Sequence, residues 1–413
     1  MKKYFIISLA VLAAGLGGVG FYFGGYNAYA DSRGGEGIGK HAPVCGSERA
    51  GEARCHAHVI VDEKGKPKTT TAPAAYGPNQ LRSAYNLTST VGSPSQVIAI
   101  VDAYDDPNIQ SDLDTYSSRF GIASLPSCSG PVALSTVSCF QKVDQRGGTN
   151  YPTVDSGWAL EIALDVEIAH GVCPSCSILL VEADSSTLAN LFAAVDRAAT
   201  LGATEMSNSY GTSREFSGET TYDSHFNRKG IAITVSSGDS GYGTSYPAAS
   251  PYVTSTGGTS LYLDSFGNYS TESAWSGSGS GCSSQETLKP SGQPTIGNCA
   301  RRIIADVSAV ADPNTGAAVY DSVPYNGSSG WFKVGGTSLS SPLIAAVYAL
   351  AGGVSSALYG NAMPYALKTA GNIHDITSGK NGRCSGVNIA LCTATSGFDG
   401  PTGLGTPNGV GAF

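Results

Sequence analysis

The stretch SGWALEIALDVEIAHGVCPSCSILLVEA, residues 156–183, contains the two kinds of element from which this chain is built. Residues 157–169 form an apolar run of helical length, and residues 177–183 form the shorter apolar run that is typical of a buried strand. Further runs of both kinds lie on either side: a strand at 96–104, a helix at 188–203 and a strand at 231–239. Buried strands that alternate with helices predict the α/β class, with a doubly wound, mostly parallel sheet flanked by helices.

The composition indicates a globular protein with many loops. Of 413 residues, 41% are hydrophobic, which is enough for a substantial core, whereas only 14% are charged and 54 are glycine. The net charge is −8, and the sequence has no basic patch. These two features exclude nucleic acid as an expected partner.

The N-terminus has the features of an export signal. Two lysines precede an apolar stretch at residues 4–23, and Ala-Tyr-Ala at 28–30 offers a small-x-small cleavage site. A membrane anchor is the alternative, because about 20 apolar residues can span a bilayer. The glycines in the stretch and the cleavage site favour a signal peptide at 1–30. We therefore expect a secreted monomer with no stable membrane association after signal cleavage.

Ten cysteines lie in five couples that are close in sequence, which suggests short-loop disulfides formed in an oxidising compartment. The couples are Cys45/Cys55, Cys128/Cys139, Cys173/Cys176, Cys282/Cys299 and Cys384/Cys392. The third couple also has the spacing of a redox motif, although nothing around it resembles thioredoxin.

Residues 31–75 are polar, and we interpret them as a short N-terminal segment or propeptide. His56 and His58 within this segment could ligate a metal, but a mobile or strand-like surface segment is the simpler interpretation. The compact domain is expected to begin at Tyr76 and to cover residues 76–413.

A nucleophilic serine is indicated by VGGTSLSSPLIAAVYALAG, residues 334–352, where Gly-Thr-Ser leads into an apolar run. Ser338 would need a base to take its proton, and a histidine held by an aspartate is the usual choice. His170 is the best histidine for this role, with Asp102 closing an earlier strand. It ends its helix, however, and Gly-Val follows it instead of glycine and a hydroxyl residue, so its context disfavours it.

Two carboxylates on the same helix are better candidates for the base. Glu161 and Asp165 stand at i and i+4, about 40° apart on one helical face, and they otherwise lie among apolar residues. Buried together, they would share a proton and one pKa would rise. A solvated acidic stripe that extends to Glu167 is the alternative.

A third carboxylate ends a predicted strand. Asp239 lies in ITVSSGDSGYG, residues 233–243, where a buried strand runs into a Gly-Asp-Ser-Gly turn. Functional residues of α/β folds gather at the carboxyl ends of strands. An Asx-turn role is the alternative for an isolated motif of this kind.

In this order, Glu-x-x-x-Asp, Ser-Gly-Asp-x-Gly and Gly-Thr-Ser-x-x-x-Pro resemble the motifs of the sedolisin, or serine-carboxyl peptidase, family over residues 76–413. The resemblance implies a subtilisin-like fold with Ser338 as nucleophile, Glu161 as general base and Asp165 as its partner. Asp239 would stand in the oxyanion hole with the backbone N–H of Ser338. A carboxyl donates a hydrogen bond only when protonated, and the ordinary pKa of Asp and Glu is about 4. The resemblance therefore implies an endopeptidase that cleaves polypeptides in acid.

The resemblance also implies one structural Ca²⁺ in the C-terminal loops. Sedolisins bind it through Asp-[Ile/Val] and a later Gly-x-Gly-aromatic-Asp, and the matching positions are Asp375, Ile376, Thr395, Gly397 and Asp399. Thr395 replaces the first glycine, which is tolerable if only its carbonyl binds. Oxygen ligands on tight loops suit calcium, although composition alone favours an ordinary surface loop.

The resemblance to sedolisins does not extend to the residues before 76. Sedolisins usually carry a long folded prodomain, whereas only about 45 residues separate the predicted signal from the peptidase domain. Two other functions remain as alternatives: a subtilisin-like protease that uses Asp102, His170 and Ser338, and a non-catalytic secreted binding protein on the same scaffold. Residues 208–211 and 276–281 are expected to flank the cleft and to pair with an extended peptide.

Overall fold

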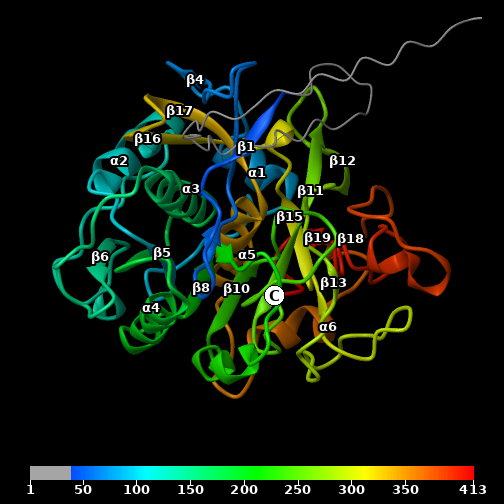
Figure 1. Ribbon diagram of the computed structural model, residues 1–413. Helices are drawn as coiled ribbons and strands as arrows, with labels where there is room; N and C mark the ends of the chain where they lie inside the picture. Colours follow the sequence, from blue (N-terminus) through cyan, green and yellow to red (C-terminus); the bar gives the residue numbers. More distant parts are fainter. Residues whose placement is uncertain (1–38) are drawn as a thin grey trace, which may run out of the picture.

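The computed structural model describes residues 39–413, and within this range its centre is an eight-stranded sheet (Figure 1). The strand order is β12-β11-β10-β8-β5-β7-β6, with β15 beside β11, and every pair is parallel except β11 with β12. The strands are β5 (Val97–Ala103), β6 (Phe140–Asp144), β7 (Ser177–Ala183), β8 (Glu205–Asn208), β10 (Ala232–Ser236), β11 (Thr254–Leu263), β12 (Tyr269–Ala274) and β15 (Val307–Val310). The predicted doubly wound, mostly parallel sheet is confirmed.

The strand order reverses beside β5. The chain builds β6 and β7 on one side of β5 and then returns to build β8, β10 and β11 on the other side. Sheets of this kind bind ligands at the carboxyl ends of their strands, at the point of reversal. Asp102 near the end of β5 and Ser209 just after β8 both lie there.

Two apolar helices, α3 (Ser156–Val172) and α5 (Thr337–Ala351), pack against each other and against the sheet. Helix α3 is mostly apolar and buried along its length, as expected of a core helix, although it also carries three carboxyls and His170. Asp155 caps it by accepting hydrogen bonds from two backbone N–H groups of the first turn, at 3.0 Å each. The other described helices are α1 (Pro78–Ala84), α2 (Ile109–Phe120), α4 (Leu188–Thr200) and α6 (Met363–Leu367).

Residues 39–75 of the N-terminal segment belong to the packed fold. Strands of this segment join two later strands in an antiparallel sheet made of β1 (His41–Pro43), β3 (His58–Ile60), β4 (Thr69–Thr70), β16 (Ala317–Tyr325) and β17 (Ser328–Gly335). The expectation of a surface segment is wrong for its histidines, because His56 and His58 are only 3% and 7% exposed. Backbone pairing with strands distant in sequence buries both histidines.

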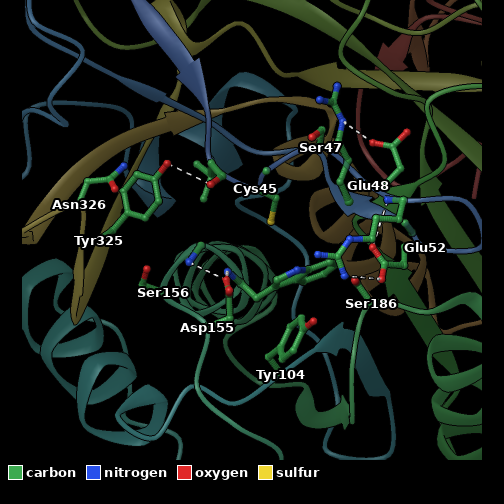
Figure 2. A pocket seen from close by; sticks show the side chains of 17 residues that line it. Cys45, Ser47, Glu48, Glu52, Tyr104, Asp155, Ser156, Ser186, Tyr325 and Asn326 are labelled. Atoms are coloured by element: carbon green, nitrogen blue, oxygen red, sulfur yellow. Dashed lines mark hydrogen bonds and ion pairs between the residues drawn. The ribbon is translucent and has the colours of Figure 1, made fainter. Parts of the chain in front are cut away.

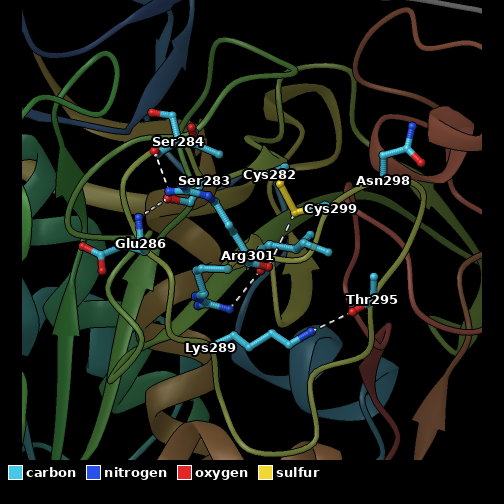
Figure 3. The surroundings of a disulfide bond; sticks show 12 residues. Cys282, Ser283, Ser284, Glu286, Lys289, Thr295, Asn298, Cys299 and Arg301 are labelled. Carbon is cyan, nitrogen blue, oxygen red and sulfur yellow. Dashed lines mark hydrogen bonds between the residues drawn. A yellow bond between two sulfur atoms is a disulfide. The ribbon is translucent and has the colours of Figure 1, made fainter.

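Three short antiparallel pairs complete the described strands: β2 (Arg54–Cys55) with β9 (Tyr210–Gly211), β13 (Gly281–Cys282) with β14 (Ile303–Ile304), and β18 (Ile373–His374) with β19 (Thr406–Pro407). All five predicted cysteine couples form disulfides, and no cysteine within residues 39–413 is free. Figure 3 shows one of them, Cys282–Cys299, which ties β13 to the loop that leads into β14.

The predicted signal peptide, residues 1–30, lies outside the described residues. Among the residues that the structure does describe, every helix is too short or too polar to cross a membrane.

Candidate active site

The predicted catalytic residues meet at the start of α5. Ser338 lies in the first turn of this helix, and its hydroxyl donates a hydrogen bond to the backbone carbonyl of Ser209 at 3.2 Å. Asp239 follows β10 and is bound to the same turn, because its Oδ1 accepts from the backbone N–H and from the hydroxyl of Thr337, both at 2.8 Å. Glu161 and Asp165 come from α3, which packs against α5.

The turn into α5 depends on Gly336. Its φ of +99° lies in the region that favours glycine. A β-carbon at this position would be 1.9 Å from the carbonyl oxygen of His56 and 2.7 Å from Oδ2 of Asp239. The missing side chain therefore lets two oxygens approach the N-terminus of α5, where backbone N–H groups have no partner within the helix.

Glu161 and Asp165 are fully buried, and burial raises the pKa of both carboxyls well above their usual values. The charge of Asp165 raises the pKa of Glu161 further, and Asp102 acts on both in the same direction. Because two buried like charges repel, the pair favours sharing a proton over ionising both carboxyls. The alternative of a solvated acidic stripe is wrong, since Glu167 is buried as well.

The Ser338 hydroxyl lies beside the Glu161 carboxyl. As a polar partner, the hydroxyl offsets part of the rise in the pKa of Glu161. No hydrogen bond joins the two groups, however. Neither carboxyl oxygen of Glu161 has a hydrogen-bond partner, and the Ser338 hydroxyl donates to the carbonyl of Ser209. The two groups are thus neighbours whose hydrogen bond requires a rotation of the serine side chain. Such contacts often tighten only when substrate binds.

The two carboxyl oxygens of Asp239 differ, because one accepts hydrogen bonds and the other has none. Its Oδ1 takes both hydrogen bonds from Thr337, whereas its buried Oδ2 has no hydrogen bond and lies 3.7 Å from Nε2 of His58. Burial raises the pKa of Asp239 to about 7, although the hydrogen bonds from Thr337 oppose this rise. In acid the carboxyl is therefore protonated, and Oδ2 can donate a hydrogen bond beside the N-terminus of α5.

Asp102 belongs to the same carboxyl cluster, although the sequence motifs did not include it. Both of its oxygens are buried without hydrogen-bond partners, and burial raises its pKa to about 8. In the sequence, its place at the end of a strand marks it only as the partner of His170. His170 lies elsewhere: it is nine residues after Glu161, about 180° around α3, and its Nε2 contacts the carbonyl of Ala123 at 3.0 Å.

The five predicted calcium ligands lie in one group of C-terminal loops. The carboxylate of Asp375 accepts from the backbone N–H of Gly397 at 2.9 Å, and Asp399 accepts from that of Thr395 at 2.8 Å. Burial raises the pKa of Asp399 to about 7, and the charge of Asp375 contributes. Carboxylate oxygens are the kind of ligand that Ca²⁺ prefers, and here all four accept hydrogen bonds from backbone N–H or hydroxyl groups of the same loops.

A polar cavity of about 350 Å³ lies between the loop at 44–54 and the start of α3 (Figure 2). Tyr104, Trp158 and Ser186 line part of it. Ser338 is not among the lining residues, and its side chain is fully buried. The nucleophile therefore has no open access through this cavity.

Comparisons with known proteins show what this chain is similar to. The sequence pattern of the subtilase family matches residues 150–375, more than half of the chain. Kumamolisin from Bacillus sp. (strain MN-32) is 30% identical over 380 residues, which cover 83% of this chain and 63% of that protein. Sedolisin from Pseudomonas sp. (strain 101) is 28% identical over 396 residues, which cover 86% of this chain and 63% of that protein. The chain spans less than two thirds of the length of these two relatives.

A solved structure is also similar. Pseudomonas sedolisin, a serine-carboxyl proteinase complexed with two molecules of pseudo-iodotyrostatin, matches 82% of this chain and 96% of its own chain. The two share 26% of their residues, with a TM-score of 0.64. The predicted subtilisin-like fold is confirmed.

Proposed function

The chain belongs to the subtilase family and, through these relatives, to the sedolisins; from this premise we propose that it is a serine-type endopeptidase that hydrolyses peptide bonds in acid through a Ser-Glu-Asp triad. The observation that carries the proposal is the buried pair of Glu161 and Asp165 beside Ser338. Asp239, joined to the same helical turn through Thr337, adds the group that the reaction needs for its oxyanion.

In the proposed reaction, the Ser338 oxygen attacks the carbonyl carbon of the peptide while Glu161 accepts the hydroxyl proton. Asp165 holds Glu161 in place and shares its proton. The oxyanion accepts hydrogen bonds from the protonated Oδ2 of Asp239 and from the backbone N–H of Ser338. Glu161 then returns the proton to the leaving amine, and water, activated in the same way, hydrolyses the acyl-enzyme.

The pH dependence follows from Asp239. With a pKa raised to about 7 by burial, this carboxyl is protonated in acid and loses its proton as the pH rises through that value. Only the protonated form donates to an oxyanion, so activity is expected in acid and is expected to fall on the alkaline side. A histidine base would have the opposite dependence, because acid protonates it.

Hydrolysis of an unfolded protein, followed from about pH 2 to about pH 9, tests the proposal. We expect cleavage in acid by the wild type, none by Ser338→Ala, and continued cleavage by His170→Ala. An alkaline maximum that His170→Ala abolishes would favour the triad of Asp102, His170 and Ser338. A folded protein that cleaves nothing, even in variants that expose Ser338, would favour the non-catalytic binding protein.

We further propose that the C-terminal loops hold one structural Ca²⁺. Its ligands would be the carboxylates of Asp375 and Asp399 and the backbone carbonyls of Ile376, Thr395 and Gly397. The ion would relieve the repulsion between the two carboxylates and would hold the loops together, without a part in the reaction.

A chelator should lower the Tm of the wild type by about 2–5 °C, because an ion that binds only the folded state stabilises that state. Asp399→Asn should melt at the lower temperature with or without the chelator. Equal melting of the wild type under both conditions would contradict the site.

We also propose that the protein is secreted as a monomer, with a signal peptide at 1–30, a short segment or propeptide at 31–75 and the peptidase domain at 76–413. Five disulfides support export into an oxidising compartment. Mass spectrometry of protein from the culture medium should find an N-terminus at residue 31 or beyond. Full-length protein in the membrane fraction would favour an anchor.

A further inference from the structure

Strand β2 of the N-terminal segment lies between β9 and the loop that follows β7, beside the proposed active site. It pairs antiparallel with β9, with Cys55 opposite Tyr210. On its other side, the backbone N–H of Ala53 donates to the carbonyl of Ser186 at 2.8 Å. The segment is thus held as an added strand, which is a common way for a domain to bind an extended peptide.

The register of this strand places His56 at the nucleophile. The backbone N–H of His56 donates to the carbonyl of Ser209 at 3.1 Å, and the Ser338 hydroxyl donates to the same carbonyl. The carbonyl oxygen of His56 lies against Gly336, close to the open Oδ2 of Asp239. This carbonyl therefore lies near the carboxyl that is proposed to stabilise the oxyanion.

A pocket receives the His56 side chain. His56 is 3% exposed, and its Nδ1 lies 2.7 Å from the hydroxyl of Ser236 at the end of β10. A β-carbon on Gly211 would be 2.8 Å from the imidazole Cε1, so the absence of a side chain there makes room for the ring. Polar contact at the base and glycine at the wall shape this pocket for a flat side chain.

We propose that residues 44–57 are a built-in inhibitor, which fills the substrate cleft as a peptide substrate would and presents the bond between His56 and Ala57 to Ser338. The inference rests on the proposed peptidase function. It also assigns the pocket between β9 and β10 to the side chain that precedes the cleaved bond.

Both ends of the presented bond are anchored. Before the bond, a disulfide links Cys55 to Cys45. After the bond, the carbonyl of Ala57 accepts from the backbone N–H of Val44 at 2.9 Å, and β3 continues into the sheet beside β17. Pairing of β1 with β3 also connects the two sides of the bond to each other.

These anchors explain how a substrate-like segment can inhibit. Attack would join the Ser338 oxygen to the His56 carbonyl carbon and would break the bond to the Ala57 nitrogen, which takes the proton from Glu161. The new amine stays in place because β3 holds it. It can therefore attack the ester, re-form the peptide bond and restore the Ser338 hydroxyl faster than water can enter.

Two proline substitutions test the inference, because proline has no N–H to donate. His56→Pro removes the hydrogen bond to Ser209, and Ala53→Pro removes the one to Ser186. Glu63→Pro, in the exposed turn that follows β3 and lies outside residues 44–57, is the matched control. We expect kcat/KM on an internally quenched peptide at about pH 4 to rise at least about tenfold in the first two variants and to stay unchanged in the control. Wild-type activity equal to that of correctly folded open variants would overturn the inference.

A binding measurement keeps the test independent of catalysis. A labelled synthetic peptide of residues 44–57, closed by its disulfide, is titrated into Ser338→Ala and into the double variants Ser338→Ala/His56→Pro and Ser338→Ala/Ala53→Pro. We expect at least about tenfold tighter binding to the double variants, since their cleft is vacated. Equal affinities overturn the built-in inhibitor. A third outcome is tighter binding to the double variants with no cleavage by His56→Pro or Ala53→Pro. That outcome would support occupation of the cleft by the segment but would refute the proposed peptidase function.

Discussion

Helix α3 carries buried carboxyls on two of its sides, and the two groups differ in their surroundings. The serine-side cluster shares the neighbourhood of Ser338 and consists of Glu161, Asp165 and Asp102. The loop-side cluster lies toward α2 and β16 and consists of Glu167, Asp106, Asp112 and Asp321. Burial raises pKa values in both clusters, to about 8 for Asp102 and also to about 8 for Asp321. A raised pKa therefore does not distinguish the proposed catalytic group from the other.

The hydrogen-bond partners of the carboxyl oxygens do distinguish them. Each loop-side carboxyl accepts from a backbone N–H, at 2.7–2.9 Å, and the four donors are Asn108, Tyr320, Ser322 and Val323. On the serine side, both oxygens of Asp102 and of Glu161 lack such partners. A carboxyl that a backbone N–H holds by one oxygen keeps at most one oxygen for proton exchange, whereas Glu161 and Asp102 keep two. Asp239 is of the first kind, as are Asp106, Glu167 and Asp321. The comparison teaches that the open oxygens and the nearby hydroxyl, more than the pKa, indicate the site.

The largest expected effect separates the two clusters directly. Glu161→Gln should lower kcat by about 10³-fold or more, because glutamine cannot accept the serine proton. Glu167→Gln, on the same helix, keeps an oxygen for the backbone of Tyr320 and should retain activity within about threefold. Steady-state kinetics on one peptide substrate in acid compare the two. Equal losses would show that the distinction by open oxygens is wrong.

Asp239 sharpens the comparison through its role as a donor. Asp239→Ala should lower kcat by about 10²-fold, the usual loss for one oxyanion donor. Asp239→Asn keeps a hydrogen-bond donor that does not titrate. The loss of activity that the wild type shows as the pH rises through about 7 should therefore be absent from this variant. Asp321→Asn serves as the control, and it should leave the pH profile unchanged. An unchanged alkaline limb in Asp239→Asn would contradict the role.

The loop-side cluster should control stability instead. Burial raises the pKa of Asp321 to about 8, with the charges of Asp106 and Asp112 adding to the effect. A raised carboxyl pKa stabilises the fold fully below the unfolded value of about 4, and this stabilisation is lost as the pH rises through the folded value. Asp321→Asn cannot ionise, so it should reduce the loss of unfolding free energy between about pH 4 and about pH 8 by about 1–2 kcal/mol.

Urea titrations in a Ser338→Ala background, which prevents self-digestion, measure this difference. Asp114→Asn is the matched control, because Asp114 is an exposed carboxyl on α2 near Asp112. If the unfolding free energy of Asp321→Asn falls with pH as steeply as that of the control, the loop-side assignment is wrong.

The smallest expected effect concerns His170. His170→Ala should keep acid activity within about twofold, since its Nε2 contacts only the carbonyl of Ala123 among the hydrogen bonds described. The substitution should instead lower the Tm of the protein. A loss of activity as large as that of Glu161→Gln would instead place His170 in the reaction.

Much of this architecture could be predicted from local sequence. Apolar runs at β5, β7 and β10 and on α3 and α5 are long enough to identify a parallel sheet with core helices. The spacing of Glu161 and Asp165 predicts one helical face, and the position of Asp239 after a strand predicts a place at the sheet edge. The couples of cysteines also paired as their spacing indicated.

The rest depends on contacts between distant residues. Asp102 joins the serine-side cluster only because β5 lies between β7 and β8, which no local pattern reveals. The polar stretch before residue 76 carries no apolar signal, yet β2 pairs with β9, about 155 residues further along the chain. His56 and His58 are buried through this pairing, and composition alone indicated a surface for them.

The attachment of β2 to the rest of the chain has a consequence for concentration. An inhibitor that is a separate molecule dissociates on dilution, whereas a tethered segment keeps an effective concentration of about millimolar or higher at any protein concentration. The fraction of molecules with an open cleft should therefore be the same in a dilute secretion as in a concentrated stock. Release would require a change within the molecule, such as a cut in the exposed loop around Ser47, and specific activity that rises on simple dilution would point to a separate bound inhibitor.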